Sequence, residues 1–264
     1  IGVIVAVCPP HAASAEPPAI RVAIVQDQPE VALAVHGGFR ITALETPEAL
    51  QEGRRLPKTS VRATPQGIVF GEQALWRDGV RVEPARDATI DLNGRRLRGT
   101  LAILTQPNQT LLVVNHVDLE EYLQGVLSKE APVYWPSEAL KALAIAARTY
   151  TVFQQLSKTS LAYDVSGDVL SQVYGGKSAE RGKTTRAVRG TRGLILTYQG
   201  KVFPAFYHST CGGLTEEASV MGPFDLAPLK GKVACSFCVE SPFYRWQRRL
   251  SGADLGWAVK QGGR

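Results

Sequence analysis

The sequence lacks the features that mark several protein classes. It has no run of 18 or more apolar residues, which excludes a complete membrane-spanning helix, and no repeat or heptad period. Methionine occurs once and cysteine four times among 264 residues. Hydrophobic residues make up 44% and charged residues 20%, as in a folded chain and unlike a disordered one. The length fits one large domain or two small ones.

The chain begins with an apolar run and has no initiator methionine. Residues 1–7 (IGVIVAV) match the hydrophobic part of a secretory signal, and residues 13–15 (Ala-Ser-Ala) form a small-residue cleavage site. We therefore expect residues 1–15 to be the remnant of a signal peptide; a buried N-terminal strand is the alternative. A lipid-modified Cys8 is disfavoured because bulky Val7 precedes it. We also expect the C-terminus to be truncated.

Short runs of β-forming residues follow one another up to residue 118. Spacing near ten residues with turn signals between the runs is typical of a small sandwich or barrel-like sheet. Asn93-Gly94 is a strong hairpin signal between two of them. The runs are residues 20–25, 31–35, 60–63, 67–70, 80–82, 88–92, 97–104 and 110–115.

The pattern changes to helical at residue 118. Asp118 is an expected N-cap with Glu121 three positions later, which predicts a short helix. Ser137, after Pro136, is the expected cap of a long alanine-rich helix that runs to about residue 155. A strand pair at 193–198 and 202–207, with a turn at Gln199-Gly200, follows after loops.

These elements predict an α+β fold. A β-rich N-terminal part, residues 16–118, would pack with a mixed helix and strand part, residues 119–264, around the long helix.

Glu130 lies in the proline-bounded connection between the two helices, near Tyr134 and Trp135. An apolar, aromatic environment disfavours the charged carboxylate and raises its pKa. A raised pKa suits a carboxyl group to general acid catalysis near neutral pH. A solvated loop glutamate is the simpler interpretation of the residue on its own.

Lys141 and Arg148 are seven residues apart on the long helix, close to two turns, and so lie on one face. Two cations there could hold a carboxylate or an anionic sugar, or could simply be solvated. Arg148 stands in an alanine-rich stretch, and a buried arginine needs partners. This favours either a functional or a structural pairing.

His208 and Cys211 form an H-x-x-C pair, and Cys235 and Cys238 form a C-x-x-C pair. Four soft ligands in two short-spaced pairs are typical of a structural zinc site. A disulfide is the alternative in an exported protein. Loss of Cys8 with the signal would leave three cysteines, which suits a Cys3His site better than a disulfide scheme.

Two glycine turns carry side chains that suit a sugar-binding cleft. Ser209 and Thr210 precede Gly212-Gly213, and Tyr174 precedes Gly175-Gly176 as an aromatic platform. Each is a weak signal by itself.

These stretches together resemble the stage II sporulation protein D/LytB family. The resemblance covers roughly residues 20–250 and is strongest from residue 113 onward. One departure is Ala131, where methionine is frequent in the family. The matching stretches are residues 114–126, 128–132, 135–150, 171–176, 207–213, 235–238 and 241–246.

The resemblance implies a lytic transglycosylase of peptidoglycan with Glu130 as its single catalytic acid and base. It implies that Lys141 and Arg148 lie in the active-site cleft. It also implies that Tyr150, Gln172, Tyr174, Ser209 and Thr210 contact the glycan, and that a metal binds near the H-x-x-C segment.

Peptidoglycan glycan strands are the expected partner, in the periplasm, cell wall or intermembrane space of a bacterium. The net charge of +6 is compatible with an anionic wall but does not identify a partner. The alternative is a non-catalytic wall-binding protein that enhances an N-acetylmuramoyl-L-alanine amidase. No nucleic-acid partner is expected, and the oligomeric state is not defined by the sequence.

Overall fold

The computed structural model describes residues 4–7, 19–74, 78–158, 162–247 and 249–252. The described residues up to Tyr207 form one compact unit, and those from His208 onward form a second. Cys8 and the expected cleavage site lie outside the described residues. No helix within the described ranges has the length and apolar character needed to cross a bilayer.

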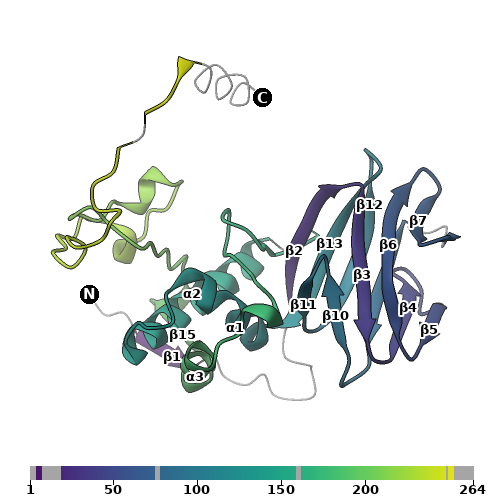
Figure 1. Ribbon diagram of the computed structural model, residues 1–264. Helices are drawn as coiled ribbons and strands as arrows, with labels where there is room; N and C mark the ends of the chain where they lie inside the picture. Colours follow the sequence, from purple (N-terminus) through teal and green to yellow (C-terminus); the bar gives the residue numbers. More distant parts are fainter. Residues whose placement is uncertain (1–3, 8–18, 75–77, 159–161, 248, 253–264) are drawn as a thin grey trace. The chain divides into compact units, whose positions relative to one another are not determined.

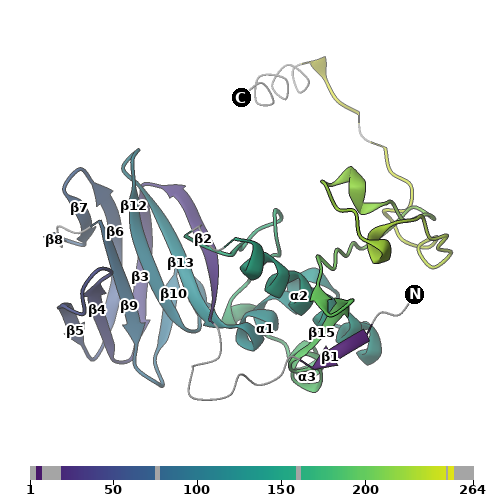
Figure 2. The same cartoon turned by 180° about the vertical axis from the view of Figure 1, so that it is seen from behind.

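The first unit contains two large sheets packed face to face (Figures 1 and 2). One has six strands in the order β11 (Arg95–Leu97), β10 (Thr89–Leu92), β3 (Glu30–His36), β6 (Leu56–Thr64), β7 (Gly67–Phe70) and β8 (Gln73–Ala74). The other has seven, in the order β14 (Val165–Ser166), β2 (Ala19–Gln28), β13 (Thr110–Asp118), β12 (Thr100–Gln106), β9 (Gly79–Pro84), β4 (Phe39–Ala43) and β5 (Ala49–Gly53). The expected sandwich is confirmed.

Alternating burial explains how the strands form this sandwich. On β3, Val31, Leu33 and Val35 point into the core and are at most 2% exposed. Burial of each such side chain contributes about 1.5–3 kcal/mol relative to exposure. On β13 the five successive residues 111–115 are all buried, because Leu112 and Val114 on its other face belong to a second, smaller apolar cluster. The strand that leads into the helices is therefore held on both faces.

The predicted hairpin turns are present. Asn93 and Gly94 have φ values of 53° and 82° and join β10 to β11. Gln199 and Gly200, at 50° and 74°, join β15 (Leu194–Tyr198) to β16 (Lys201–Val202). Positive φ at both central residues is the geometry that matches the twist of paired strands.

Among the residues that the structure describes, three α-helices follow the sandwich. Helix α1 (Leu119–Glu130) begins directly after β13, and the Asp118 side chain accepts hydrogen bonds from the backbone N–H groups of Glu120 and Glu121, as predicted. Helix α2 (Ser137–Ser157) is the long alanine-rich helix. Its N-cap is Pro136 and not Ser137, and no side chain caps it, so the predicted serine cap is wrong.

Helix α3 (Gly182–Gly190) was not predicted from the sequence. Its two threonines and its terminal glycines have low helix propensity, and it contains only two apolar residues. Tertiary packing stabilises α3 instead, because Ala187 and Val188 are buried on the side of α3 that contacts α1 and α2.

Residues Ile4–Val7 form strand β1, which pairs antiparallel with β15. The alternative expectation was a buried N-terminal strand, of which the structure shows the strand. The signal peptide itself stays a prediction. Short elements complete the described chain: η1 (Lys177–Ala179) in the first unit, and η2 (Ala218–Val220) and η3 (Ala227–Leu229) in the second.

Gly99 provides a test of how tightly the chain packs against β13 within the sandwich. Its φ is +71°, and a Cβ there would lie 2.0 Å from the carbonyl oxygen of His116 on β13. Gly94 has a similar φ of +82° but no atom within 4 Å of a Cβ. We expect Gly99→Ala to lower the free energy of unfolding by about 3 kcal/mol or more, because strain and overlap add. We expect a smaller loss for Gly94→Ala, because it adds only the backbone strain of a positive φ and no steric overlap. Urea denaturation of both variants measures the difference, and equal losses would contradict the packing at Gly99.

Candidate active site and cysteine cluster

Glu130 is the last residue of α1 and is half-buried. Its Oε1 accepts a hydrogen bond of 2.7 Å from the backbone N–H of Val173. Burial raises the pKa of the Glu130 carboxyl, and the Val173 hydrogen bond opposes this by stabilising the charged form. Glu130 is therefore a fixed carboxyl group, not a freely solvated one.

Gln172, next to Val173, is buried and only 1% exposed. Its Oε1 accepts hydrogen bonds from the hydroxyls of Tyr122 and Thr151, at 3.1 and 2.8 Å. Its Nε2 donates to the Tyr207 hydroxyl oxygen at 2.9 Å and to the Ala147 carbonyl at 3.3 Å. These bonds use both ends of the amide. Gln172 therefore has no exposed polar group with which to bind a glycan. It instead stabilises the segment whose next residue, Val173, binds Glu130.

Tyr207 is a site residue that sequence reasoning missed. Because its oxygen accepts from the fixed Gln172 amide, its own hydroxyl hydrogen remains available, and it has no acceptor within the described residues. Burial, with the nearby Glu130 charge, raises the pKa of Tyr207 well above its usual value, so the phenol stays neutral. The available signal was its place at the start of the stretch 207–213 that carries the family resemblance.

Tyr174 is a core residue in the structure, whereas the sequence suggested a sugar platform. It is 1% exposed, its ring centroid lies 5.0 Å from that of Tyr122, and its hydroxyl donates to Oδ1 of Asn115 at 3.2 Å. A Cβ at Gly125 of α1 would lie 2.6 Å from its ring. The close approach of ring and helix explains the glycine in α1.

Tyr150 is the more accessible of the two predicted tyrosines. It is half-buried, and its ring centroid lies 6.2 Å from that of Phe206. Burial raises the pKa of Tyr150, and hydrogen bonds with Ser171 and Gln154 oppose that rise. Tyr150 therefore presents part of a neutral aromatic side chain at the surface of the first unit.

The two predicted cleft cations differ in their surroundings. Lys141 keeps a side-chain exposure of 41% and pairs with Glu138, one turn earlier, at 2.8 Å. Arg148 is 1% exposed, because α3 and the segment leading into β15 cover it. The expectation that both lie together in an open cleft is therefore corrected for Arg148.

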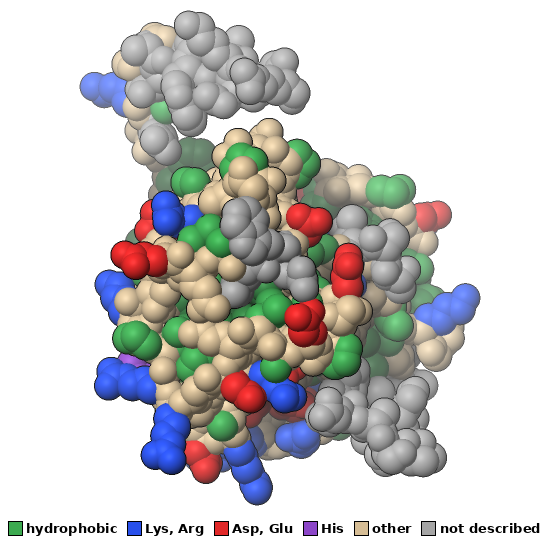
Figure 3. All heavy atoms as spheres, turned by 90° about the vertical axis from the view of Figure 1, so that its right-hand side faces the viewer, with side chains coloured by type: hydrophobic (Ala, Val, Ile, Leu, Met, Phe, Trp, Pro, Cys, Tyr) green, Lys and Arg blue, Asp and Glu red, His purple; other side chains and the backbone are tan. Residues whose placement is uncertain are grey.

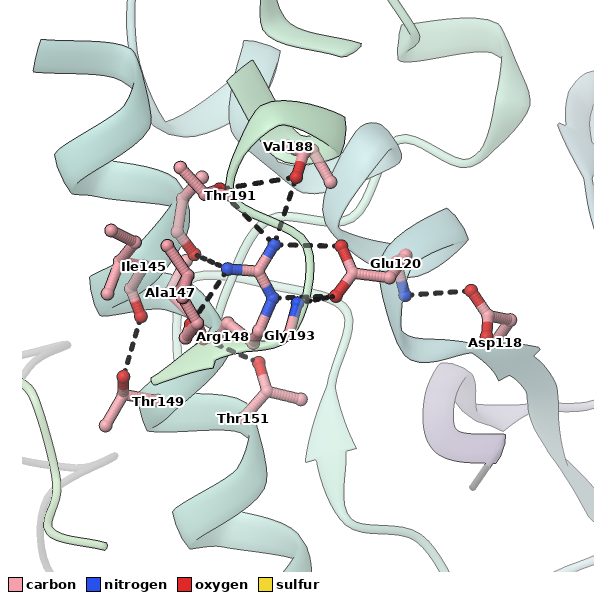
Figure 4. Close-up of polar contacts among 12 residues, drawn as sticks. Asp118, Glu120, Ile145, Ala147, Arg148, Thr149, Thr151, Val188, Thr191 and Gly193 are labelled. Carbon is pink, nitrogen blue, oxygen red and sulfur yellow. Dashed lines mark hydrogen bonds and ion pairs between the residues drawn. The ribbon is translucent and has the colours of Figure 1, made fainter. Parts of the chain in front are cut away.

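Arg148 makes a buried ion pair with Glu120 of α1 through two hydrogen bonds of 2.8 Å each (Figure 4). Its remaining N–H groups donate to backbone carbonyls, including those of Val188 and Leu194, at 3.2 and 3.0 Å. Glu120 also accepts from the Gly193 backbone N–H at 3.2 Å. The guanidinium has five N–H donors, and these contacts engage them, so Arg148 joins α1, α2, α3 and β15.

The second unit brings three of the four predicted metal ligands together. The Sγ atoms of Cys211, Cys235 and Cys238 lie within 4.8 Å of one another. The Cys211–Cys238 and Cys235–Cys238 separations are 3.6 and 3.9 Å. A backbone hydrogen bond of 2.9 Å from Cys235 to Gly213 aligns the two cysteine segments. The thiols are free in the structure, not joined as a disulfide.

His208 is exposed and is not a member of this group, so the predicted fourth ligand is corrected. The three sulfur atoms still fit a metal ion. Tetrahedral Zn²⁺ with Zn–S bonds of about 2.3 Å places its sulfurs about 3.8 Å apart. Three thiolates leave one position for another ligand.

Ser209 and Thr210, which were predicted to contact the glycan through their hydroxyl groups, also lie in the second unit. Ser209 is exposed, while the Thr210 hydroxyl shares a hydrogen bond of 2.8 Å with the Ser241 hydroxyl. Thr210 therefore helps to hold the segment after Cys238.

Part of the chain is similar to known proteins. A model of the family described as stage II sporulation protein matches residues 107–198, from β13 to β15. A stage II sporulation protein D of Bacillus amyloliquefaciens is 38% identical over 156 residues, covering 52% of this chain and 44% of the relative. Residues 107–198 of this chain are therefore similar to the stage II sporulation protein family.

Other relatives extend the family match. An uncharacterized protein of Brachyspira hyodysenteriae is 36% identical over 191 residues, 72% of this chain and 50% of that protein. An amidase enhancer of Bacillus subtilis is 35% identical over 148 residues, 54% of this chain and 20% of the relative. The chain thus spans about half the length of the first two relatives and less of the enhancer. Glu130 and Arg148 lie inside residues 107–198, which the family model matches, and the three clustered cysteines lie outside that range.

The Arg148–Glu120 pair yields a stability prediction. We expect Arg148→Met to lower the free energy of unfolding by about 3–5 kcal/mol, because it leaves a buried carboxylate without its partner. Replacing both residues, as Glu120→Leu/Arg148→Met, recovers part of that loss. Lys141→Met is the matched control, with a change within about 0.5 kcal/mol for an exposed cation. Chemical denaturation measures all three, and a loss no larger for Arg148→Met than for Lys141→Met would refute the structural role.

Proposed function

We propose that this stage II sporulation protein D relative is a peptidoglycan lytic transglycosylase with Glu130 as its single acid and base. The observation that carries the proposal is a half-buried carboxyl whose pKa is raised by burial and whose position is fixed by Val173. Raised pKa and fixed position are the two requirements of a general acid that works near neutral pH.

The chemistry requires one carboxyl group in two protonation states. Protonated Glu130 donates its proton to the glycosidic oxygen as the bond between the sugars breaks. The resulting carboxylate then takes the proton of the sugar's own C6 hydroxyl while that oxygen bonds to C1, which closes a 1,6-anhydro ring. Glu130 is protonated again at the end, and no water is consumed.

Most glycosidases use two carboxylates, and a close second carboxylate would raise the pKa of Glu130 by charge repulsion. Burial is the cause of the rise here, and no described acidic side chain contributes to it. The surroundings of Glu130 therefore support the one-carboxylate mechanism. The neutral Tyr207 hydroxyl, near the same carboxyl, supplies a hydrogen-bond donor for a substrate oxygen.

Substitution of Glu130 tests the proposal directly. We expect Glu130→Gln to lower release of 1,6-anhydro sugars from purified glycan strands by at least about a hundredfold, because an amide cannot transfer the proton. Glu52→Gln, at an exposed position on β5, is the matched control and should keep full release. Mass spectrometry identifies the products. Unchanged anhydro products from Glu130→Gln would reject the assignment.

The pH dependence follows from the direction of the pKa shift. A raised pKa keeps Glu130 protonated to higher pH than a solvated glutamate. Activity that depends on the acid form should therefore persist above pH 4.5 and fall as the pH rises through the Glu130 pKa. The same sign holds for stability: the protonated form is favoured by folding, so this contribution is lost as the pH rises.

We further propose that Cys211, Cys235 and Cys238 hold a structural zinc ion. Two of their sulfur separations, 3.6 and 3.9 Å, fit tetrahedral geometry, and the third is within 4.8 Å. Zinc would fix the segments around the two C-terminal cysteines and takes no part in the proton transfers above.

Elemental analysis of purified protein tests the zinc site. We expect about one zinc per wild-type chain and strong loss in Cys235→Ser, because one of three thiolates is removed. Ser236→Ala, the neighbouring exposed position, is the control and should retain the metal. Equal zinc in wild type and Cys235→Ser would reject the zinc assignment, and fewer than three titratable thiols in metal-free protein would indicate a disulfide.

The amidase enhancer of Bacillus subtilis supports a second candidate function, a wall-binding protein that stimulates a cell-wall amidase. Under that function, purified protein acting on isolated glycan gives no anhydro product, and the measured effect is a faster amidase. Either function requires peptidoglycan as partner, and we propose that the protein works outside the cytoplasmic membrane.

A further inference from the structure

A cation occupies every third position along α3 and just beyond it. These residues are Lys183, Arg186, Arg189 and Arg192, which we call the cationic face. Residues 177–192 contain six lysines and arginines and one acidic residue, Glu180. The Glu180 carboxylate is already occupied by the Arg98 guanidinium, at 2.6 and 3.0 Å.

The packing of α3 turns these cations outward. Thr184, Ala187 and Val188 form its inner face and are at most 4% exposed. Arg186, Arg189 and Arg192 are exposed, and none of the three forms an ion pair with a described carboxylate. On the side of the molecule seen in Figure 3, by contrast, positive and negative side chains are intermingled.

Helix stability does not account for this arrangement. Like charges three residues apart on a helix repel each other. Lys183 is the second residue of α3, near the positive end of the helix dipole, where a cation is unfavourable. Only Arg189, in the last turn, is placed favourably for the dipole. An anionic ligand along α3 would relieve the repulsion.

The cationic face begins beside the candidate active site. The Lys183 ammonium donates a hydrogen bond of 3.3 Å to the Tyr134 carbonyl, in the connection between Glu130 and α2. At the other end of α3, a Cβ on Gly190 would lie 3.9 Å from Cε of Lys141. A polymer bound along α3 therefore passes close to the connection that follows the catalytic carboxyl.

We propose that the cationic face binds carboxylates of a peptidoglycan strand and holds the strand while another part of it reaches Glu130. The identity of the ligand rests on the proposed function, because a glycan at Glu130 is what brings its carboxylates to α3. Arginine suits the role, since its planar guanidinium pairs with a carboxylate through two parallel hydrogen bonds. The carboxylates come either from the sugars' lactyl groups or from the stem peptides.

The test measures binding without cleavage. All proteins carry Glu130→Gln, and the probe is insoluble peptidoglycan freed of phosphate-bearing polymers, with bound protein measured by sedimentation. We expect Arg186→Gln/Arg189→Gln to weaken binding by about five- to tenfold, as for the loss of two exposed ion pairs. Arg54→Gln/Arg55→Gln, the same charge change at two exposed positions between β5 and β6, should leave it unchanged. Arg186→Lys/Arg189→Lys should recover most of the binding.

Further arms identify the carboxylate. Amidation of the glycan carboxyls should reduce binding of the parent protein to the level of the Arg186→Gln/Arg189→Gln variant. Strands with and without stem peptides then show which carboxylates contribute. Added salt should weaken binding of the parent more than binding of the Arg186→Gln/Arg189→Gln variant. Salt screens ion pairs, and the variant lacks the two arginine–carboxylate pairs that the parent forms.

Equal binding by the Arg186→Gln/Arg189→Gln and Arg54→Gln/Arg55→Gln proteins, with both folded by circular dichroism, overturns the inference. Binding to anionic lipid vesicles is measured with the same proteins. If Arg186→Gln/Arg189→Gln lowers binding to the vesicles and leaves binding to peptidoglycan unchanged, the inference is also overturned and the cationic face is assigned to a membrane. Failure of the enzyme proposal gives a different result. In that case protein with Glu130 intact forms no anhydro product, while the arginine substitutions still reduce binding to the wall.

Discussion

The Arg148–Glu120 ion pair is the interaction on which the helical part of the protein depends. It joins α1, α2, α3 and the start of β15 through one guanidinium and one carboxylate, both almost fully buried. Such a pair gains stability only when its remaining donors and acceptors are also satisfied. Here the carbonyls of Val188 and Leu194 and the N–H of Gly193 satisfy them. Glu130 is on the same α1 helix as Glu120, so a rigid anchor at one end of α1 fixes the direction in which the other end presents its carboxyl.

A second buried network fixes Glu130 more locally. Gln172 is held by Thr151 and Tyr122 on one side and holds Tyr207 on the other, while its neighbour Val173 binds Glu130. The polar residues predicted together as one active site therefore fall into two groups, one partly exposed and one buried. Only Glu130, Tyr150, Tyr207 and Lys141 keep some exposure in the first unit. Arg148, Gln172 and Tyr174 are buried and hydrogen-bonded within the protein, so a motif can contain polar residues that support the fold.

Much of the architecture was predictable because local signals and packing agree. The alternation on β3, the Asn93-Gly94 turn and the Asp118 cap each specify their own element, and the structure contains all three. Helix α3 was missed because its propensity is low and its stability comes from contacts with α1 and α2. For the site, the spacing of Cys211, Cys235 and Cys238 sufficed to predict the cluster. The exposure of His208 was not predictable, because it depends on how the backbone turns before Cys211.

The sequence by itself determined which residues could carry chemistry: a carboxyl near the junction of two helices, one His-Cys and one Cys-Cys pair, and two cations on one helix face. Residue type and spacing are local properties, so they can be derived from the chain. Only the tertiary structure decided which of these groups are accessible. Lys141 and Arg148 share a helix face by geometry, yet α3 and β15 cover one and leave the other in water. The burial of Arg148 is set by segments 40 and 46 residues away in the chain. Burial is what separates a group that can act on a substrate from one that holds the fold.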